Sequence, residues 1–214
     1  LAMVGQMAIL TTDMVMLGWL GPEALAATAL GLSAFHPVML FGIGIGTAVT
    51  PLAAAALAKR QVREMRRVVR QGFWAAVPFT LLAIPALAWI GGLFEAIGQD
   101  AALSQTAELY LRGVLPGLFF VLVFNVLRSY ATALEQTRAV LLITLLAIPS
   151  NALINYGLIF GAFGLPRLEV LGAGLASSLT NILMALGLAA VVAYRLPFRR
   201  HHVFGRLWRP DWPI

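Results

Sequence analysis

Six long apolar segments, separated by short connections that hold most of the charged residues, dominate this sequence of 214 residues. The segments lie near residues 1–20, 30–57, 73–93, 110–134, 139–160 and 172–194. A helix needs about 20 mainly apolar residues to cross the hydrocarbon core of a bilayer, and each segment is long enough for that. Because backbone groups must be paired in lipid, only helices or closed β-barrels span it, and the sequence lacks the alternation of barrel strands. We therefore predict an all-α integral membrane protein with six transmembrane helices.

The composition agrees with a membrane protein and excludes other classes. Hydrophobic residues make up 60% of the chain and charged residues 11%, whereas soluble domains carry roughly 25% charged residues. The formal net charge of +6 comes without the aromatic and basic surface of a nucleic-acid-binding module, so no nucleic-acid partner is expected. The lack of cysteine removes disulfides and thiolate metal sites. No combination of nucleophile, base and orienting residue points to an enzyme.

Basic residues predict how the chain lies in the membrane. Thirteen of the 15 lysines and arginines fall on one side: Lys59, Arg60, Arg63, Arg66, Arg67, Arg70, Arg128, Arg138, Arg195, Arg199, Arg200, Arg206 and Arg209. Only Arg112 and Arg167 fall on the other. By the positive-inside rule, the amino terminus and a basic linker at 195–214 are expected in the cytoplasm. The segment 59–72 is expected to be either an amphipathic helix on the inner leaflet or a solvated determinant of topology.

Asp13 falls inside an apolar segment, whereas the other eight acidic residues lie in connections or in the tail. An unpaired carboxylate is costly in hydrocarbon, so this side chain should face a polar cavity or carry a proton part of the time. Gln6 lies seven residues earlier on about the same helix face and is a candidate cavity residue. We interpret Asp13 as a proton- or cation-coupling residue. The alternative is an aspartate near the outer end of its span that reaches interfacial water, because residues 18–21 end the helix soon afterwards.

Further polar side chains lie within the other apolar segments. Asn151 and Asn155 are spaced i,i+4 and therefore share a helix face. Their amide oxygens can face a cation, although a membrane asparagine more often forms a hydrogen bond between helices. Ser177 supplies a hydroxyl in a segment of small residues that permits close packing. His36 is either a hydrogen-bonded structural histidine or a proton relay, and it joins Tyr156 as a candidate cavity-lining residue.

Four stretches occur in the order and spacing of a known family. They are Thr12-Asp13 through Gly21 with Leu25-Ala26-Ala27; Phe41-Gly42-Ile43-Gly44 through Thr50-Pro51-Leu52; Val69-Arg70-Gln71-Gly72-Phe73-Trp74; and Asn155-Tyr156-Gly157 through Gly161 with Gly172-Ala173-Gly174. The chain thereby resembles the multidrug and toxic compound extrusion (MATE) family, specifically its NorM-type bacterial branch. The resemblance covers essentially the whole chain but about half of such a protein. It implies the amino-terminal six-helix lobe of a twelve-helix transporter, present here either as a fragment or as a natural half-transporter.

The resemblance also implies a function. Members of this family are secondary antiporters that export cationic drugs or other organic compounds across the bacterial inner membrane in exchange for protons or sodium ions, without a cofactor. It assigns the coupling role to Asp13, Asn151, Asn155 and Ser177, and a sodium ion to the first three. In one branch an aspartate takes the place of Asn155 and a threonine that of Ser177, so Asp13 is the only charge of this set. The expected partners are small, cationic organic substrates, the bilayer and the missing carboxy-terminal lobe.

Other functions stay open at this point. A flippase for lipid-linked oligosaccharides, from the same superfamily, is expected to carry more cationic cavity residues for a pyrophosphate head group, and no arginine lies in the middle of a predicted span. A channel or a helical scaffold would not need a lone carboxylate at Asp13. An intramembrane enzyme would reveal itself through a product formed by the purified protein.

Overall fold

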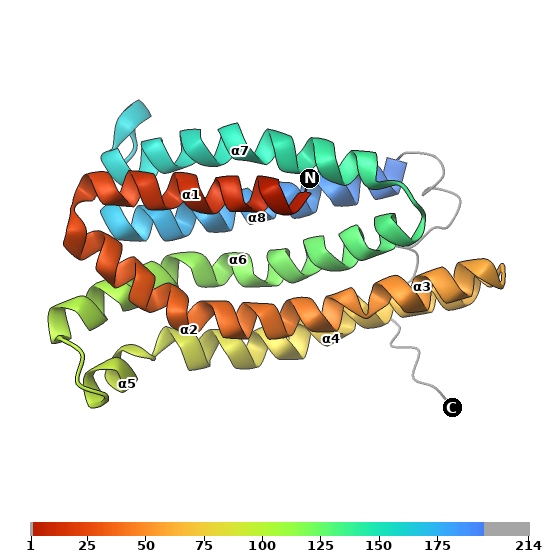
Figure 1. Cartoon of the computed structure of the whole chain (residues 1–214), viewed down its shortest axis with the longest axis horizontal. Coiled ribbons are helices and arrows are strands. Elements are labelled where there is room, and N and C mark those ends of the chain that lie inside the picture. Colours follow the sequence, from red (N-terminus) through yellow and green to blue (C-terminus); the bar gives the residue numbers. More distant parts are fainter. Residues whose placement is uncertain (1, 195–214) are drawn as a thin grey trace.

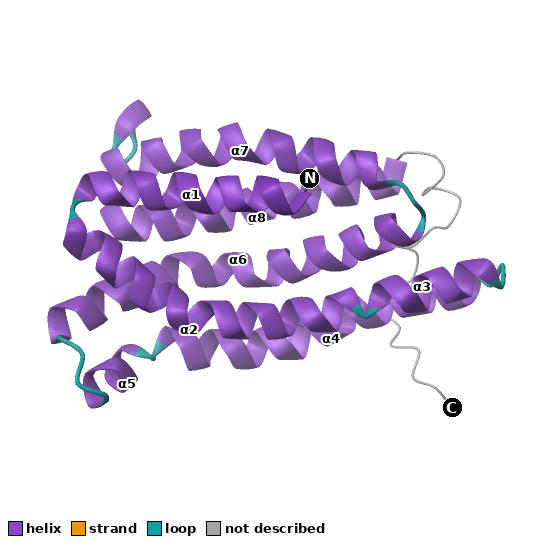
Figure 2. Ribbon diagram, in the orientation of Figure 1, coloured by secondary structure: helices purple, strands orange, loops and turns teal. Residues whose placement is uncertain are grey.

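The computed structural model describes residues 2–194, and the regular secondary structure in this range is entirely helical (Figure 1, Figure 2). The predicted all-α fold is therefore confirmed for this part of the chain. The predicted linker at 195–214 lies outside the described residues, and so does the side chain of Gln6.

Long helices that run side by side make up the bundle (Figure 1). In chain order the elements are α1 (Ala2–Leu20), α2 (Pro22–Thr47), α3 (Val49–Ala58), α4 (Val62–Ala88), α5 (Gly91–Ala96), α6 (Ala101–Ala133), α7 (Thr137–Phe160), the 3-10 turn η1 (Ala162–Gly164) and α8 (Glu169–Tyr194). Five stretches are long and apolar enough to cross a membrane: Pro22–Ala58, Val62–Ala88, Ala101–Ala133, Thr137–Phe160 and Glu169–Tyr194. The shorter apolar stretch Met7–Leu20 lies in α1.

The second apolar segment forms two helices, α2 and α3, which are separated at Ala48. Pro51 has no N–H to donate to the carbonyl of Thr47, and its ring crowds that carbonyl. Asn125 of α6 ties the break to the core, since its Nδ2 donates to the Ile43 carbonyl at 2.9 Å and to the Thr47 hydroxyl at 3.4 Å. The interruption between α2 and α3 is therefore a packed feature of the bundle.

α4 contains residues of two segments that differ in the sequence: the basic segment 59–72 and the apolar segment 73–93. The basic segment 59–72 is not a surface helix of its own, because the residues from Val62 onward form the first turns of a helix that continues unbroken to Ala88. Met65 and Val69 in these turns are completely buried, and they belong to an apolar cluster shared with α3 and α6. The first turns of α4 therefore pack against α3 and α6 as part of the bundle.

α6 and α8 pack at very short range. A Cβ atom added at Gly174 would lie 2.5 Å from the carbonyl oxygen of Tyr110 and 3.0 Å from Cα of Gly113, so a side chain cannot fit there without movement of α6. Ser178 strengthens the contact: its hydroxyl donates to the Gly113 carbonyl at 2.6 Å and accepts the Gly117 N–H at 3.0 Å. One hydroxyl thus bridges two backbone groups of α6. Small residues and short hydrogen bonds of this kind are the main contacts between membrane helices.

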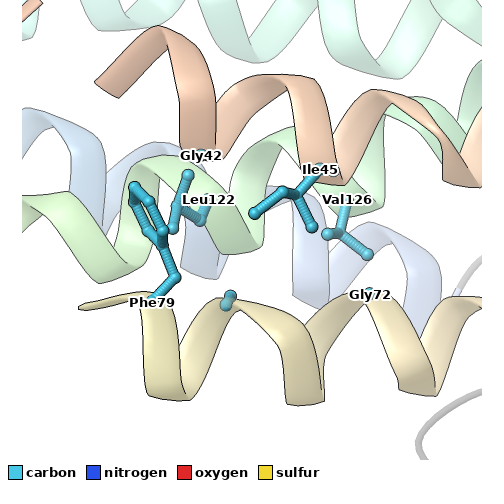
Figure 3. A pocket seen from close by; sticks show the side chains of 8 residues that line it. Gly42, Ile45, Gly72, Phe79, Leu122 and Val126 are labelled. Carbon is cyan, nitrogen blue, oxygen red and sulfur yellow. The ribbon is translucent and has the colours of Figure 1, made fainter. Parts of the chain in front are cut away.

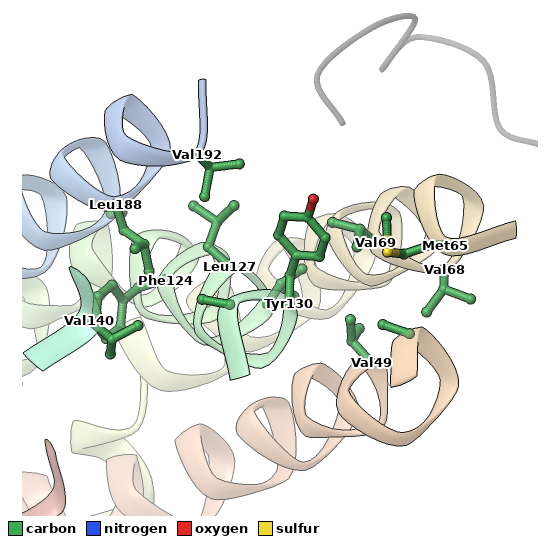
Figure 4. Packing of buried hydrophobic residues seen from close by; sticks show 14 of the residues in the cluster. Val49, Met65, Val68, Val69, Phe124, Leu127, Tyr130, Val140, Leu188 and Val192 are labelled. Carbon is green, nitrogen blue, oxygen red and sulfur yellow. The ribbon is translucent and has the colours of Figure 1, made fainter. Parts of the chain in front are cut away.

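Two clusters of buried apolar side chains fill the bundle. The first lies at the end of the bundle where α3 is followed by α4, and Figure 4 shows it between α4, α6 and α8. Its largest side chains include Met65, Leu127, Tyr130 and Leu188. The second joins α1, α2 and α6 and includes Leu17, Leu32, Phe35 and Leu118. Together they fix the spacing of the helices that carry polar groups.

Gly174→Ala tests the close approach of α6 and α8. The new methyl group would overlap backbone atoms of α6, and overpacking of this kind costs about 1–3 kcal/mol. We expect a lower midpoint of thermal unfolding, followed by circular dichroism in detergent. Gly44→Ala in α2 is the control, because a Cβ there meets no atom within 4 Å. Equal unfolding midpoints for the two variants would contradict the packing described.

Candidate functional site

Three helices carry the polar groups that meet inside the bundle. α1, α7 and α8 lie alongside one another (Figure 1) and contact each other pairwise. Asp13 of α1 is thereby placed beside Asn155 of α7 and Ser177 of α8, residues that lie 142 and 164 positions away in the sequence. The site depends on the tertiary fold, because no single helix supplies more than part of it.

Both oxygens of the Asp13 carboxylate accept hydrogen bonds from neutral groups. The Nδ2 atom of Asn155 donates to one oxygen at 2.5 Å, and the Ser177 hydroxyl donates to the other at 3.0 Å. Asp13 is only 7% exposed, and it forms no ion pair with any residue between 2 and 194. A buried carboxylate is therefore compensated by amide and hydroxyl dipoles instead of by a basic residue.

The hydrogen bonds continue from Asp13 along α7 to α8. Asn155 Nδ2 also donates to the Oδ1 atom of Asn151 at 3.1 Å, and Asn151 Nδ2 donates to the Thr180 hydroxyl at 3.4 Å. Thr180 in turn donates to the carbonyl of Ala176 at 2.8 Å. The i,i+4 spacing of the two asparagines stacks their amides on one face of α7, and both are fully buried. A continuous polar network thus joins the carboxylate to the backbone of α8.

One acceptor in this network is unused. The Oδ1 atom of Asn155 is buried and has no hydrogen-bond partner in the described part of the chain. A buried polar atom without a partner is costly and calls for an explanation, such as a bound ion or water molecule. The oxygen belongs to the same amide that donates to Asp13, so it lies at the polar centre of the bundle.

Asp13 also borders a half-open cavity of about 240 Å³. Side chains of α1, α2, α6 and α8 line it, and most of them are apolar. The polar lining residues are Asp13, His36, Tyr110, Ser177, Thr180 and Asn181. A largely apolar cavity with a few grouped polar side chains is the usual form of a site for a small organic molecule.

The candidate residues from the sequence have different positions in the structure. Asp13, Asn151, Asn155 and Ser177 are brought together, and His36 lines the cavity. Tyr156 does not line it: the residue is 47% exposed, and its ring packs against Phe160 and Phe163. Successive side chains of a helix point about 100° apart, so Tyr156 faces away while its neighbour faces inward.

Three polar residues of the site were missed by the sequence analysis: Tyr110, Thr180 and Asn181. Thr180 lies three positions after Ser177, a spacing that places both on one face of α8 and is a readable signal. Tyr110 faces the cavity from α6 and is 4% exposed. It stands at the edge of a predicted span, where a tyrosine is ordinarily read as an interfacial anchor, and so the sequence pattern carries no sign of its position.

A second hollow lies between α2, α4 and α6 (Figure 3). It has no room for a water molecule, and Phe79, Leu122 and Val126 border it. Each of its lining residues is a glycine or an apolar residue. Without a polar group to orient a ligand, this hollow is a packing space and we do not consider it a functional site.

The residues expected to hold a sodium ion differ from the usual ligands of a transition metal. No group of three or more histidine, cysteine, aspartate or glutamate side chains is close enough to hold a metal ion among residues 2–194. The sodium ligands expected from the sequence are instead one carboxylate and two amides, at Asp13, Asn151 and Asn155. Carboxylate and carbonyl oxygens suit hard cations, and hydrogen bonds already connect these three side chains.

These features define a polytopic α-helical membrane protein with a buried polar network beside an internal cavity. Residues 1–157 match the sequence profile of the MatE family. A protein named "Probable multidrug resistance protein NorM" from Mesorhizobium japonicum is 42% identical over 219 residues, which cover 98% of this chain and 45% of that protein. A protein of the same name from Brucella suis is 40% identical over 216 residues, with the same two coverages.

The chain therefore belongs to the MATE family, and it spans about 45% of the length of these curated relatives. Solved structures agree on the fold. The eukaryotic MATE transporter AtDTX14 matches with a TM-score of 0.79 and 22% identity, over 92% of this chain and 43% of its own. A P26A mutant of a MATE protein matches with a TM-score of 0.80 and 21% identity, over 94% of this chain and 44% of its own. The described helices have the fold of one lobe of a MATE transporter.

Thr180→Val tests whether the network reaches α8. The substitution keeps the shape of the side chain but leaves the buried Nδ2 of Asn151 without this acceptor, at a cost of about 1–3 kcal/mol. We expect a lower thermal unfolding midpoint in detergent. Thr106→Val is the matched control, because that exposed hydroxyl bonds only within its own helix, to Ala102. If both variants unfold like the unmodified chain, the hydrogen bond between Asn151 and Thr180 does not contribute to stability.

Proposed function

We propose that this chain forms one lobe of a secondary antiporter, which exports cationic drugs or other organic compounds in exchange for protons or sodium ions. It acts in the bacterial inner membrane together with a second six-helix lobe. Its relatives that carry the name multidrug resistance protein NorM support export of several organic compounds. The basic residues of the connections support a cytoplasmic location for the amino terminus and for residues 195–214.

The buried carboxylate of Asp13 is the observation that carries this proposal. It is the only charged side chain that is buried among the described residues, and no basic residue neutralises it. A single carboxylate can be neutralised by a cationic substrate, by a proton or by a sodium ion, but by one of them at a time. An uncompensated charge in a low-dielectric interior is costly. Competition for Asp13 would therefore link the release of substrate to the uptake of an ion.

The walls of the cavity support a cationic rather than an anionic substrate. Of its lining residues, Asp13 alone carries a formal charge at neutral pH, and the lining includes neither lysine nor arginine. Phe35 and Tyr110 are aromatic residues of the lining, and aromatic faces attract organic cations. A pyrophosphate head group would meet a carboxylate and no positive charge in this cavity, which argues against the flippase alternative.

Each coupling ion would use the network differently. A proton would bind the Asp13 carboxylate, whose oxygens would then bond less strongly to Asn155 and Ser177, so the contacts between α1 and its neighbours would loosen. A sodium ion would need oxygen ligands. The carboxylate supplies two, Asn155 has an oxygen without a hydrogen-bond partner, and Asn151 could turn its amide oxygen inward. In both cases the ion changes how α1 is held, and differential binding to two conformations can drive alternating access.

Asp13→Asn in the full-length transporter tests the coupling role. The amide is nearly isosteric but cannot bind a proton, and it attracts cations far less than a carboxylate. We expect ethidium efflux from cells that lack other exporters to fall to the background of cells without the transporter. Asp100→Asn is the matched control: Asp100 is exposed and caps the start of α6 through the N–H groups of Ala102 and Leu103, a role that asparagine also performs.

Undiminished efflux by Asp13→Asn at equal expression would rule out Asp13 as the coupling residue. Ion conductance in reconstituted vesicles without exchange of an organic compound would instead support the channel alternative. Loss of efflux in Asp100→Asn as well would mean that the assay reports on folding, and the amount of folded protein would then have to be compared before any role is assigned.

A further inference from the structure

The polar residues that line the cavity beside Asp13 fall into two groups. Asp13, Ser177 and Thr180 already form the hydrogen bonds of the buried network. The other three form no side-chain hydrogen bond with any residue from 2 to 194, and they are His36, Tyr110 and Asn181. Their polar atoms are therefore available to a molecule that enters the cavity.

The position of Asn181 relative to Asp13 follows from the geometry of α8. Asn181 comes four residues after Ser177, so the two share one face of the helix and lie about 6 Å apart along its axis. The Ser177 hydroxyl donates to Asp13 and thereby marks the level of the carboxylate. Asn181 thus lies about one helical turn from the buried charge, toward the end of the bundle at which α8 ends and α1 begins (Figure 1).

Apolar side chains surround this end of the cavity. A Cβ at Gly42 of α2 would lie 2.8 Å from Leu122 of α6, and the N–H of Gly117 on α6 donates to Ser178 of α8 at 3.0 Å. These contacts show which residues share the level of Asn181. Apart from Thr180, whose hydroxyl is already hydrogen-bonded, the cavity residues near that level are apolar: Leu40, Ile43, Val121 and Met184.

An amide in apolar surroundings discriminates between ligands. A ligand that covers Asn181 without a hydrogen-bonding group displaces water and leaves the amide unpaired, which costs binding free energy. A ligand with such a group within reach replaces the water by a hydrogen bond of its own. Sites built in this way therefore reject analogues that lack the polar group.

We propose that Asn181 determines substrate specificity by binding a polar group of an organic cation whose charge lies at Asp13. The inference rests on the proposed function, in which Asp13 is the cation site. The Oδ1 atom of Asn181 accepts hydrogen bonds and its Nδ2 group donates them, so amines, hydroxyls and carbonyls all fit. The expected substrates are organic cations that carry such a group about one helical turn from the positive charge, in preference to purely hydrocarbon cations of the same shape.

Two ligands that differ only in their polar groups test this assignment. Ethidium carries aromatic amino groups, and its analogue without them keeps the charge and the ring system. Binding of each ligand to the purified full-length transporter would be measured by isothermal titration calorimetry. Asn181→Leu nearly keeps the volume of the side chain and should weaken ethidium binding about fivefold, which is the usual contribution of one hydrogen bond. The same substitution should not weaken binding of the analogue.

Two further variants separate the role of Asn181 from other effects. Gln105→Leu is the matched control, because it removes an exposed amide of α6 outside the cavity, and it should leave both affinities unchanged. Asp13→Asn removes the charge and should weaken binding of both ligands. Equal effects of Asn181→Leu on the two ligands, or undiminished ethidium binding, would overturn the assignment of Asn181. Undiminished binding of both ligands by Asp13→Asn would instead contradict the cation site on which the inference rests.

Discussion

Burial of one carboxylate among neutral hydrogen-bond donors is the constraint on which the rest of the site depends. Asp13 cannot lie in the interior of a helical bundle unless its charge is compensated. Here that compensation comes from an amide of α7 and a hydroxyl of α8. The three helices must therefore keep a fixed register. Any ion that binds the carboxylate changes the interactions that hold α1, which makes the first helix sensitive to the state of a single side chain.

The packing of α8 on α6 supports this register. Gly113 and Gly174 allow the two backbones to approach closely, and the Ser178 hydroxyl bridges two backbone groups of α6. Ser177 and Thr180 are then presented on another face of the same helix, toward α1 and α7. A rigid contact on one side of α8 thus positions the polar groups on the other side. Hydroxyls of the polar network and packing residues lie along the same helix, so a change in packing would also displace the network.

Sequence patterns predicted much of this arrangement, for identifiable reasons. A lone aspartate in an apolar segment and two asparagines at i,i+4 spacing are visible because polar groups are rare in lipid. The break at Ala48 precedes Pro51, whereas prolines at several other positions lie inside continuous helices, so a proline in the sequence does not by itself locate a break. The sequence analysis also missed that α4 is one continuous helix. Its first turns contain many charged residues, and only a few apolar residues there, such as Met65 and Val69, indicate a buried side. Both outcomes depend on contacts with α6, which a sequence read in isolation does not reveal.

The central claim is that ions and organic cations compete for Asp13, and equilibrium binding tests it most directly. Ethidium binding to the purified full-length transporter would be measured by fluorescence over a range of pH and sodium concentration. For the unmodified protein, a lower pH or added sodium should weaken ethidium binding. In Asp13→Asn this dependence should be lost or strongly reduced. Ethidium binding that responds to protons or sodium equally in both proteins would contradict the account.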